Sequence, residues 1–181
     1  MQAAAFTRKN LLFIRIGLMF SFTFLMVLSS QVRIPLFFTP VPLTLQTLVV
    51  LLGIIFLKRQ AYIAQIGYVS LGIAGFGVFA NGGCGPLYLL GPTGGYIAGF
   101  LLSSLIIGNV YERIGNASYG KNITLFAAAI GIIYICGISW LVSAWAVPVS
   151  VAFSTGVIPF LVPDIIKVVL AAVVAERFSR V

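Results

Sequence analysis

The chain has 181 residues, of which 61% are hydrophobic and only 8% are charged. Soluble domains carry about 25% charged residues, so a water-soluble fold would leave too much apolar surface exposed. We therefore predict one integral membrane domain over residues 1–181. The chain has no histidine, and Cys84 and Cys136 lack any metal-ligand spacing, so we expect no metal site, no cofactor and no histidine-based catalysis.

Six apolar runs predict an all-α bundle of six transmembrane helices. In chain order, the predicted helices cover residues 12–30, 44–57, 61–79, 94–111, 123–147 and 163–178. A simple crossing needs about 20 apolar residues, so the second and sixth helices are short for one. We expect these two helices to be tilted, flanked by re-entrant loop or embedded among their neighbours.

The basic residues predict the orientation of the bundle. When the N-terminus is placed inside the cell, nine of the eleven basic residues fall on the cytoplasmic side, as the positive-inside rule expects. Only Arg33 and Lys167 then lie on the outer side. An even number of helices also places both termini in the cytoplasm. The cytoplasmic set is Arg8, Lys9, Arg15, Lys58, Arg59, Arg113, Lys121, Arg177 and Arg180.

Irregular backbone and isolated polar residues gather at the predicted outer end. Asp164 and Lys167 are three residues apart, so they project from the same face of a helix. Ionisable groups inside a membrane segment are costly and normally face a cavity, a partner or a ligand. The pattern favours an outward-facing ligand pocket. The alternative is three ordinary outer loops and an ion pair that merely neutralises itself.

The outer loops hold further candidate contacts. Asn81 begins a glycine-rich run that is not a nucleotide loop, because no lysine follows its glycines. Its carboxamide either contacts a ligand or makes a turn. Gln46 either lines the pocket or forms hydrogen bonds with the loop backbone. Thr44 either lies at the pocket or is only the N-cap of the second helix. With one outward carboxylate and no Ser-His or Cys-His arrangement, the chain is predicted not to be an enzyme.

Three motifs occur in order at the starts of the second, fourth and sixth predicted helices. They are Pro42-Leu-Thr-Leu-Gln-Thr47, Gly91-Pro-Thr-Gly-Gly-Tyr-Ile-Ala-Gly99, and Ile158-Pro-Phe followed by Asp164-Ile-Ile-Lys167. Together they resemble the BioY family, the vitamin-binding membrane subunits of biotin uptake systems. The resemblance covers nearly the whole chain.

The resemblance implies that biotin binds in an outward-facing pocket under the first outer loop. The matching positions are Asn81, Asp164 and Lys167, whose groups suit the two N–H donors and one carbonyl of the ureido ring. Additional candidates are Arg33 for the valerate carboxylate, Phe37, Phe38 and Tyr96 to cover the bicyclic ring, and Thr44 and Gln46 at the pocket.

The resemblance also implies partners. Such subunits commonly work with a transmembrane coupling protein and two ATPases, in an energy-coupling-factor transporter. Docking there usually uses small residues in helix one, often alanines four apart. Here Gly17 and Ser21 are four apart but the alanines are missing, which leaves open a protein that works alone or as a homo-oligomer.

Taken together, the sequence predicts a biotin uptake subunit of a bacterial cytoplasmic membrane. Its expected partners are biotin and the lipid bilayer, with no nucleic acid. The alternative is a structural or assembly subunit of a larger membrane complex, with no small-molecule substrate. Stoichiometric binding of a small molecule by the isolated chain distinguishes the two.

Overall fold

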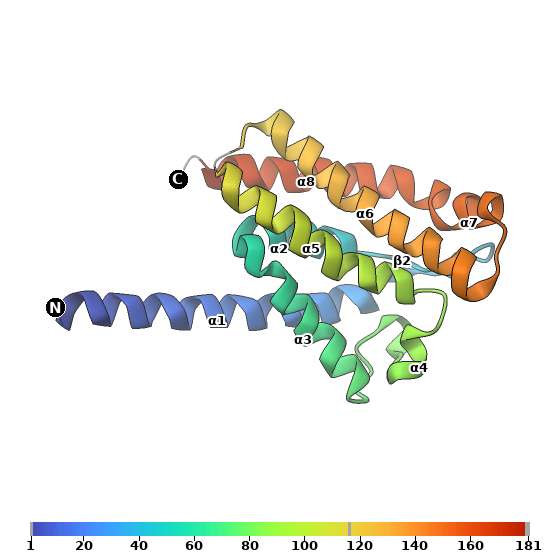
Figure 1. The fold of residues 1–181 in the computed structure, drawn as a ribbon, viewed down its shortest axis with the longest axis horizontal. Helices are drawn as coiled ribbons and strands as arrows, with labels where there is room; N and C mark the ends of the chain where they lie inside the picture. Colours follow the sequence, from blue (N-terminus) through green and yellow to red (C-terminus); the bar gives the residue numbers. More distant parts are fainter. Residues whose placement is uncertain (1, 116, 180–181) are drawn as a thin grey trace.

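The computed structural model describes residues 2–115 and 117–179, and Figure 1 shows them as a bundle of helices with a small hairpin. The long helices are α1 (Gln2–Gln31), α5 (Gly94–Ile114), α6 (Tyr119–Trp145) and α8 (Ile158–Ser179). The shorter elements are β1 (Arg33–Ile34), β2 (Leu43–Thr44), α2 (Gln46–Leu57), η1 (Lys58–Gln60), α3 (Ala61–Ile73), η2 (Ala80–Gly82), α4 (Pro86–Leu89) and α7 (Val149–Gly156). The predicted helical architecture is confirmed in this general form.

The second and third predicted helices form a hairpin of two short arms. By length and composition, the described residues contain five runs that could cross a membrane, and α2 and α3 together count as one of them, Gln46–Ile73. The run is not straight, because Lys58 has φ 53° and breaks the helix between the arms. An arm of 12 or 13 residues is about 18–20 Å long, less than the roughly 30 Å hydrocarbon core.

Several predicted boundaries were wrong. The third helix ends at Ile73 rather than 79, because Gly75 at φ 97° turns the chain. The last helix begins at Ile158 rather than 163, since Pro163 is accommodated in its second turn. The prediction of an all-α fold also missed the antiparallel pair β1–β2, in which Arg33 pairs with Thr44. The prediction that Arg180 lies on the cytoplasmic side falls outside the described residues.

Glycines bring α5 and α6 into close contact. A side chain at Gly95 would meet Trp140 and would stand 2.6 Å from the Cys136 carbonyl oxygen, and one at Gly99 would stand 2.8 Å from the Ile133 Cα. Small residues four apart allow such close packing between transmembrane helices. The contact fixes the wall of α5 and α6 that faces the interior of the bundle.

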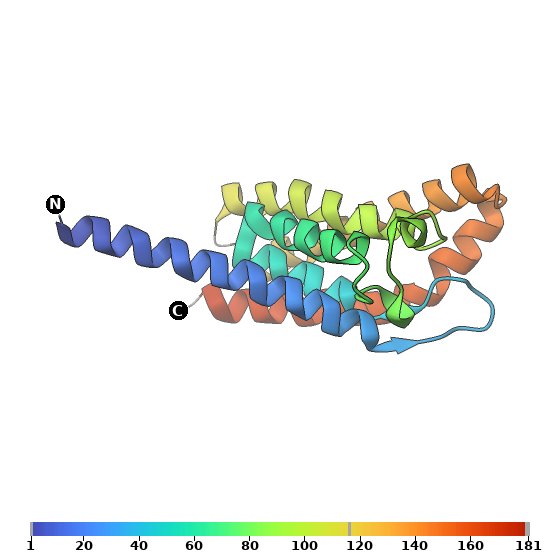
Figure 2. The same cartoon turned by 90° about the horizontal axis from the view of Figure 1, so that it is seen from below.

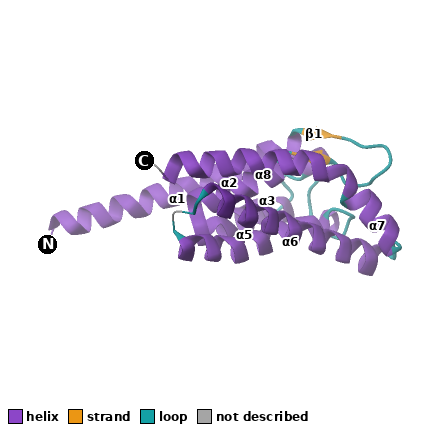
Figure 3. Cartoon of the chain, turned by 90° about the horizontal axis from the view of Figure 1, so that it is seen from above, coloured by secondary structure: helices purple, strands orange, loops and turns teal. Residues whose placement is uncertain are grey.

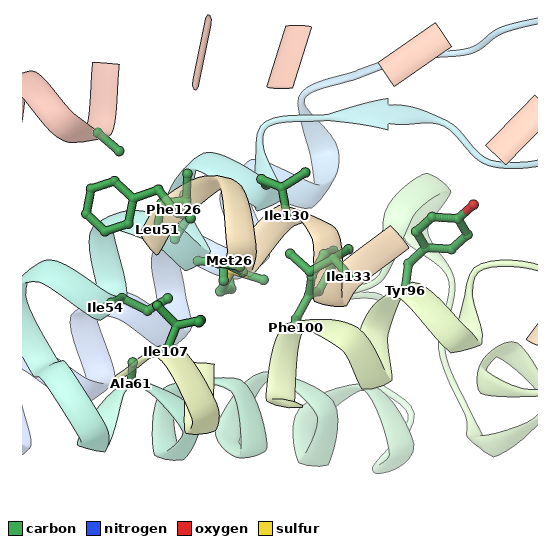
Figure 4. Packing of buried hydrophobic residues seen from close by; sticks show 14 of the residues in the cluster. Met26, Leu51, Ile54, Ala61, Tyr96, Phe100, Ile107, Phe126, Ile130 and Ile133 are labelled. Carbon is green, nitrogen blue, oxygen red and sulfur yellow. The ribbon is translucent and has the colours of Figure 1, made fainter. Parts of the chain in front are cut away.

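The hydrophobic core lies between α2, α5 and α6, with α1 and α8 closing its sides. Figure 4 shows apolar side chains from α1, α2, α3, α5 and α6 meeting in the interior. Leu51 and Ile54 of α2 and Phe126 of α6 are fully buried there. Many other apolar side chains are exposed, as expected where the surroundings are lipid rather than water. Examples are Leu12, Phe13, Phe20, Phe24, Val162, Ile165 and Ile166.

The two ends of the bundle differ in character. Helix α1 begins and α8 ends at the same end, and the first half of α1 extends beyond the other helices (Figure 2). Most loop segments, the β1–β2 hairpin and α7 lie at the opposite end (Figure 3). This second end, called the loop end below, is where the polar residues of the candidate site are found.

Candidate ligand-binding site

A buried ion pair marks the interior of the loop end. Asp164 and Lys167 of α8 have exposed fractions of only 4% and 6%. The Lys167 Nζ lies 2.8 Å from the Asp164 Oδ1. Taking both charges out of water is costly, so the pair needs further hydrogen-bond partners to be stable there.

Those partners come from β2, α2 and α6. The Thr47 hydroxyl donates to Asp164 Oδ1 at 2.9 Å, and the Tyr134 hydroxyl donates to Oδ2 at 2.7 Å. Lys167 donates to Thr47 Oγ1 and to the Thr44 carbonyl, both at 2.8 Å. The three ammonium hydrogens therefore have three acceptors, and the network is satisfied without any ligand.

Local sequence explains how these groups are presented. Pro163 directly precedes Asp164 and has no N–H, so the carbonyl of Pro159 lacks its usual partner within α8. Helix α2 begins at Gln46, just after the β2 strand, so the Thr44 carbonyl and the Thr47 side chain both face α8. Tyr134 lies midway along α6, where it reaches the same carboxylate.

The ion pair lies against an inner cavity with a volume of about 50 Å³. One water molecule needs roughly 10–15 Å³ of such space, so the cavity in this conformation holds only a few. Its walls are mainly apolar and aromatic with a few convergent polar groups, which is the usual make-up of a small-molecule site. The lining includes Val41, Thr44, Gln46, Thr47, Tyr68, Tyr88, Tyr96, Phe100, Ile133, Tyr134, Phe160, Asp164 and Lys167.

A larger outer cavity of about 330 Å³ adjoins the inner one. The two share Pro42, Ala80, Tyr88 and Thr93 in their linings. The outer cavity also takes in Arg33 and Asn81, from the hairpin and from η2. A ligand that occupied both cavities would therefore touch the buried ion pair at one end and Arg33 or Asn81 at the other.

The predicted site residues divide into three groups. Asp164, Lys167, Thr44, Gln46 and Tyr96 line the inner cavity. Arg33 and Asn81 line only the outer one, and the Asn81 backbone is left-handed at φ 67°. Phe37 and Phe38 line neither. The Phe37 ring is fully exposed and makes an edge contact with Phe38 at 5.1 Å, so this conformation does not bring the two rings to the site.

Two of the inner residues are held firmly by the fold. The Gln46 amide donates to the Tyr68 hydroxyl at 2.8 Å. The Tyr96 hydroxyl donates to the Gly156 carbonyl at 2.9 Å, and its ring occupies the space that a side chain at Gly137 would need. Tyr96 is thus a fixed wall between α5, α6 and α7. Thr44 is not the N-cap of α2, which is Leu45, although its hydroxyl accepts from the Gln46 N–H at 3.4 Å.

Sequence reasoning missed Thr47 and Tyr134. A signal existed for each. Thr47 closes the motif Pro42–Thr47, and Tyr134 is one of only two titratable residues between Lys121 and Asp164. Neither signal shows that the hydroxyl meets the carboxylate, because that contact joins residues 117 and 30 positions apart in the chain.

The fold and the site define a multi-helix membrane protein with a mainly apolar pocket at one end, which holds a buried ion pair. The BioY family model matches residues 3–181, and the chain belongs to that family. The resemblance read from the three motifs is confirmed.

Known proteins similar to the chain carry transporter names. It is 38% identical over 160 residues to "Biotin transporter BioY" of Thermotoga maritima, covering 88% of this chain and 92% of that protein. It is 36% identical over 157 residues to "Probable biotin transporter BioY" of Pyrococcus horikoshii, covering 86% and 91%. These relatives are transporters and not enzymes.

A solved structure shares the fold. It is the crystal structure of the S-component for biotin from an ECF-type ABC transporter, with a TM-score of 0.86. The match covers 95% of this chain and 94% of the other at 22% sequence identity. At that identity the likeness speaks for the fold alone.

Proposed function

We propose that the chain is a membrane subunit that binds biotin at the loop end and delivers it across the bilayer. The observation that carries the proposal is the buried Asp164–Lys167 pair at the inner cavity of a BioY family member. The relatives named as biotin transporters support biotin as the substrate. The same names favour transport over the alternative of a structural or assembly subunit.

The chemistry of the inner cavity suits a ureido ring. Asp164 accepts one ring N–H, and Lys167 donates to the ring carbonyl. The aromatic walls formed by Tyr88, Phe100 and Phe160 pack against the apolar faces of the bicycle. In this structure the Asp164 carboxylate oxygens accept hydrogen bonds from Thr47 and Tyr134. Bound biotin therefore replaces existing hydrogen bonds and does not fill an empty acceptor position.

The outer cavity suits the valerate chain. Arg33 lies there and pairs with the carboxylate, while Asn81 contacts the substrate where the two cavities meet. The inner cavity of about 50 Å³ is too small for a bicyclic ring, so binding widens it. The β1–β2 hairpin and the loop residues next to it close over the bound vitamin. The same movement brings Phe37 toward the site.

The orientation follows from charge. Lys58, Arg59 and Arg113 are exposed at the end where α1 begins, whereas Arg33 is the exposed base of the loop end within the described residues. The positive-inside rule then places the loop end outside the cell, with both chain ends in the cytoplasm of a bacterial host. The hairpin of α2 and α3 provides the second and third of six membrane segments, each embedded among its neighbours.

An ATP-driven module is the proposed source of energy. The solved structure with this fold is a component of an ECF-type ABC transporter, which supports a coupling protein and two ATPases as partners. Gly17 of α1 has open space where a side chain would be, and Ser21 donates back to its carbonyl at 2.9 Å. This leaves a shallow face on α1 for a helix of the partner. Uptake in cells with and without the module distinguishes this arrangement from a lone protein or a homo-oligomer.

Biotin binding to the purified chain in detergent tests the function. We expect stoichiometric binding by calorimetry, with competition by dethiobiotin and none by a plain fatty acid. Asp164→Asn should weaken binding by more than about tenfold, since a hydrogen bond to a charged group contributes about 1.5–3 kcal/mol. Lys167→Ala should abolish it.

Two outcomes would contradict the proposed function. Unchanged affinity in a well-folded Asp164→Asn variant removes the role given to that carboxylate. No binding by monodisperse wild-type protein points to another solute or to the assembly-subunit alternative.

A further inference from the structure

A third cavity lies at the end of the bundle away from the biotin site. It has a volume of about 310 Å³ and lies between α1, the α2–η1 turn and the last part of α5. Its lining combines five charged or polar residues with three apolar ones. The lining residues are Arg15, Leu18, Phe56, Leu57, Lys58, Arg59, Gln60 and Glu112.

The cavity has an excess of positive charge. It contains three bases and one acid, and Glu112 is 3.4 Å from Arg59. Within the part of the chain that the structure describes, neither Arg15 nor Lys58 forms an ion pair. Arg15 and Lys58, which come from different elements, therefore leave the cavity with a net positive charge, which favours an anionic occupant.

The basic turn is fixed in place. Lys58 has a left-handed backbone, and its carbonyl oxygen would lie 2.5 Å from a side chain at Gly108, so the turn presses directly on α5. Beside it, the Phe56 ring packs against Phe22 and Phe178 at centroid distances of 5.9 and 4.8 Å. The cations thus border a rigid apolar wall rather than a mobile loop.

We propose that this cavity binds the headgroup of an anionic phospholipid. The phosphate lies between Arg15 and Lys58, and an acyl chain runs along Leu18 and the exposed apolar side of α1. Basic pockets between transmembrane helices at the cytoplasmic side commonly take such headgroups. Arg15 of the lining lies near the start of the apolar run Leu12–Gln31, on the helix whose first half extends beyond the bundle. This assignment goes beyond biotin transport and does not depend on it.

Native mass spectrometry of the purified chain tests the proposal. Phosphatidylglycerol is added at increasing concentration, and phosphatidylcholine with the same acyl chains serves as the neutral comparison. The wild-type chain should retain one phosphatidylglycerol in preference to phosphatidylcholine. The double variant Arg15→Gln with Lys58→Gln should weaken that retention about thirtyfold, since each base near an anionic lipid contributes about a fivefold effect.

Matched variants separate the cavity from general surface charge. Arg113→Gln with Lys121→Gln removes two charges at the same end of the bundle but leaves the cavity lining intact, so retention should not change. The double variant Arg15→Lys with Lys58→Arg keeps both charges and should retain phosphatidylglycerol as the wild-type chain does. That result would assign the loss in the double glutamine variant to the missing charges. The helix content measured by far-ultraviolet circular dichroism checks the folding of each variant.

Three results would overturn the proposal. Equal retention of the two lipids means that the cavity does not select a charge. An equal loss in the Arg113 and Lys121 variant means that only the total charge matters. Displacement of the lipid by millimolar inorganic phosphate means that the cavity is a site for free phosphate rather than for a lipid.

Discussion

The Thr47 hydroxyl holds the centre of the buried network. It donates to Asp164 and accepts from Lys167, so one oxygen satisfies part of each charge. A buried ion pair contributes little by its own attraction, because desolvation offsets the gain. The stability of this pair therefore depends on its neutral partners. Removing one of them leaves a charge partly uncompensated in an apolar interior.

Thr47→Val tests this dependence at nearly constant volume. We expect the free energy of unfolding to fall by about 1–3 kcal/mol, because both charged groups lose a hydrogen bond. Thermal unfolding in detergent measures the change. The control is Thr124→Val, because the exposed Thr124 hydroxyl bonds only the Gly120 carbonyl of its own helix. Equal unfolding temperatures for the two variants would show that the network does not depend on Thr47.

Single residues also mark the limit of prediction from sequence. Asp164 and Lys167 were identifiable because ionisable residues are rare in this chain and their spacing places both on one helix face. Thr47 and Tyr134 were not, because threonine and tyrosine are unremarkable in membrane helices. Their roles depend on how α2, α6 and α8 pack. Phe37 and Phe38 were named by hydrophobicity alone, which does not distinguish a pocket lid from an exposed loop.

At the scale of elements, the contact between α5 and α6 is the most constrained in the bundle. It allows no side chain at Gly95 and none at Gly99 without displacing the facing backbone. Without a hydrophobic force between helices in lipid, such close packing supplies much of the association energy. This contact also sets the positions of Tyr96 and Tyr134 in the inner cavity, so loosening it should disturb the site.

Gly95→Ala tests the contact with a single methyl group. We expect a loss of about 1–3 kcal/mol in the free energy of unfolding, because Trp140 and the Cys136 carbonyl must move. The matched control is Gly131→Ala on α6, where nothing lies within 4 Å of the added atom. That variant should be neutral or gain up to about 1 kcal/mol from higher helix propensity. Thermal unfolding of both variants in one detergent gives the comparison, and equal effects would contradict the packing argument.

The number and ends of elements were only partly predictable. Long apolar runs identified α1, α5 and α6, since hydropathy over about 20 residues is a strong signal. Their ends were less well predicted, because α1 begins at residue 2 rather than 12 and α6 covers 119–145 rather than 123–147. The break between α2 and α3 was also predicted, because the polar residues Lys58–Gln60 interrupt the apolar run there. Hydropathy also does not register the β1–β2 pair, which is only two residues long on each side. Prolines 159 and 163 suggested a later start for α8 than the structure has.

At the scale of the whole molecule, the two ends have opposite roles. The loop end carries both cavities of the candidate site, and the other end carries most of the exposed positive charge. The proposed orientation therefore predicts which residues a reagent outside the cell can reach. The chain supplies a native reporter, because Cys84 is exposed at the loop end.

Cysteine labelling in intact cells checks this orientation. A membrane-impermeant maleimide should label the wild-type chain at Cys84, and Cys84→Ser should lose the label. Ser118→Cys, placed in the Cys84→Ser background, adds an exposed thiol at the start of α6 on the other end. It should react only after the cells are permeabilised. The reverse pattern would place the candidate site on the cytoplasmic side.

The pairing of Asp164 with Lys167 has an electrical consequence for the whole transport cycle. Moving one elementary charge through a membrane potential changes the energy by about 2.3 kcal/mol per 100 mV. The two side chains cancel, so this pair adds no net charge to a moving binding site. The step in which the empty carrier resets then does no electrical work at this pair. In the proposed arrangement the cargo carboxylate pairs with Arg33 on the loaded step, so any voltage dependence from the binding site arises from Arg33 when the site is empty.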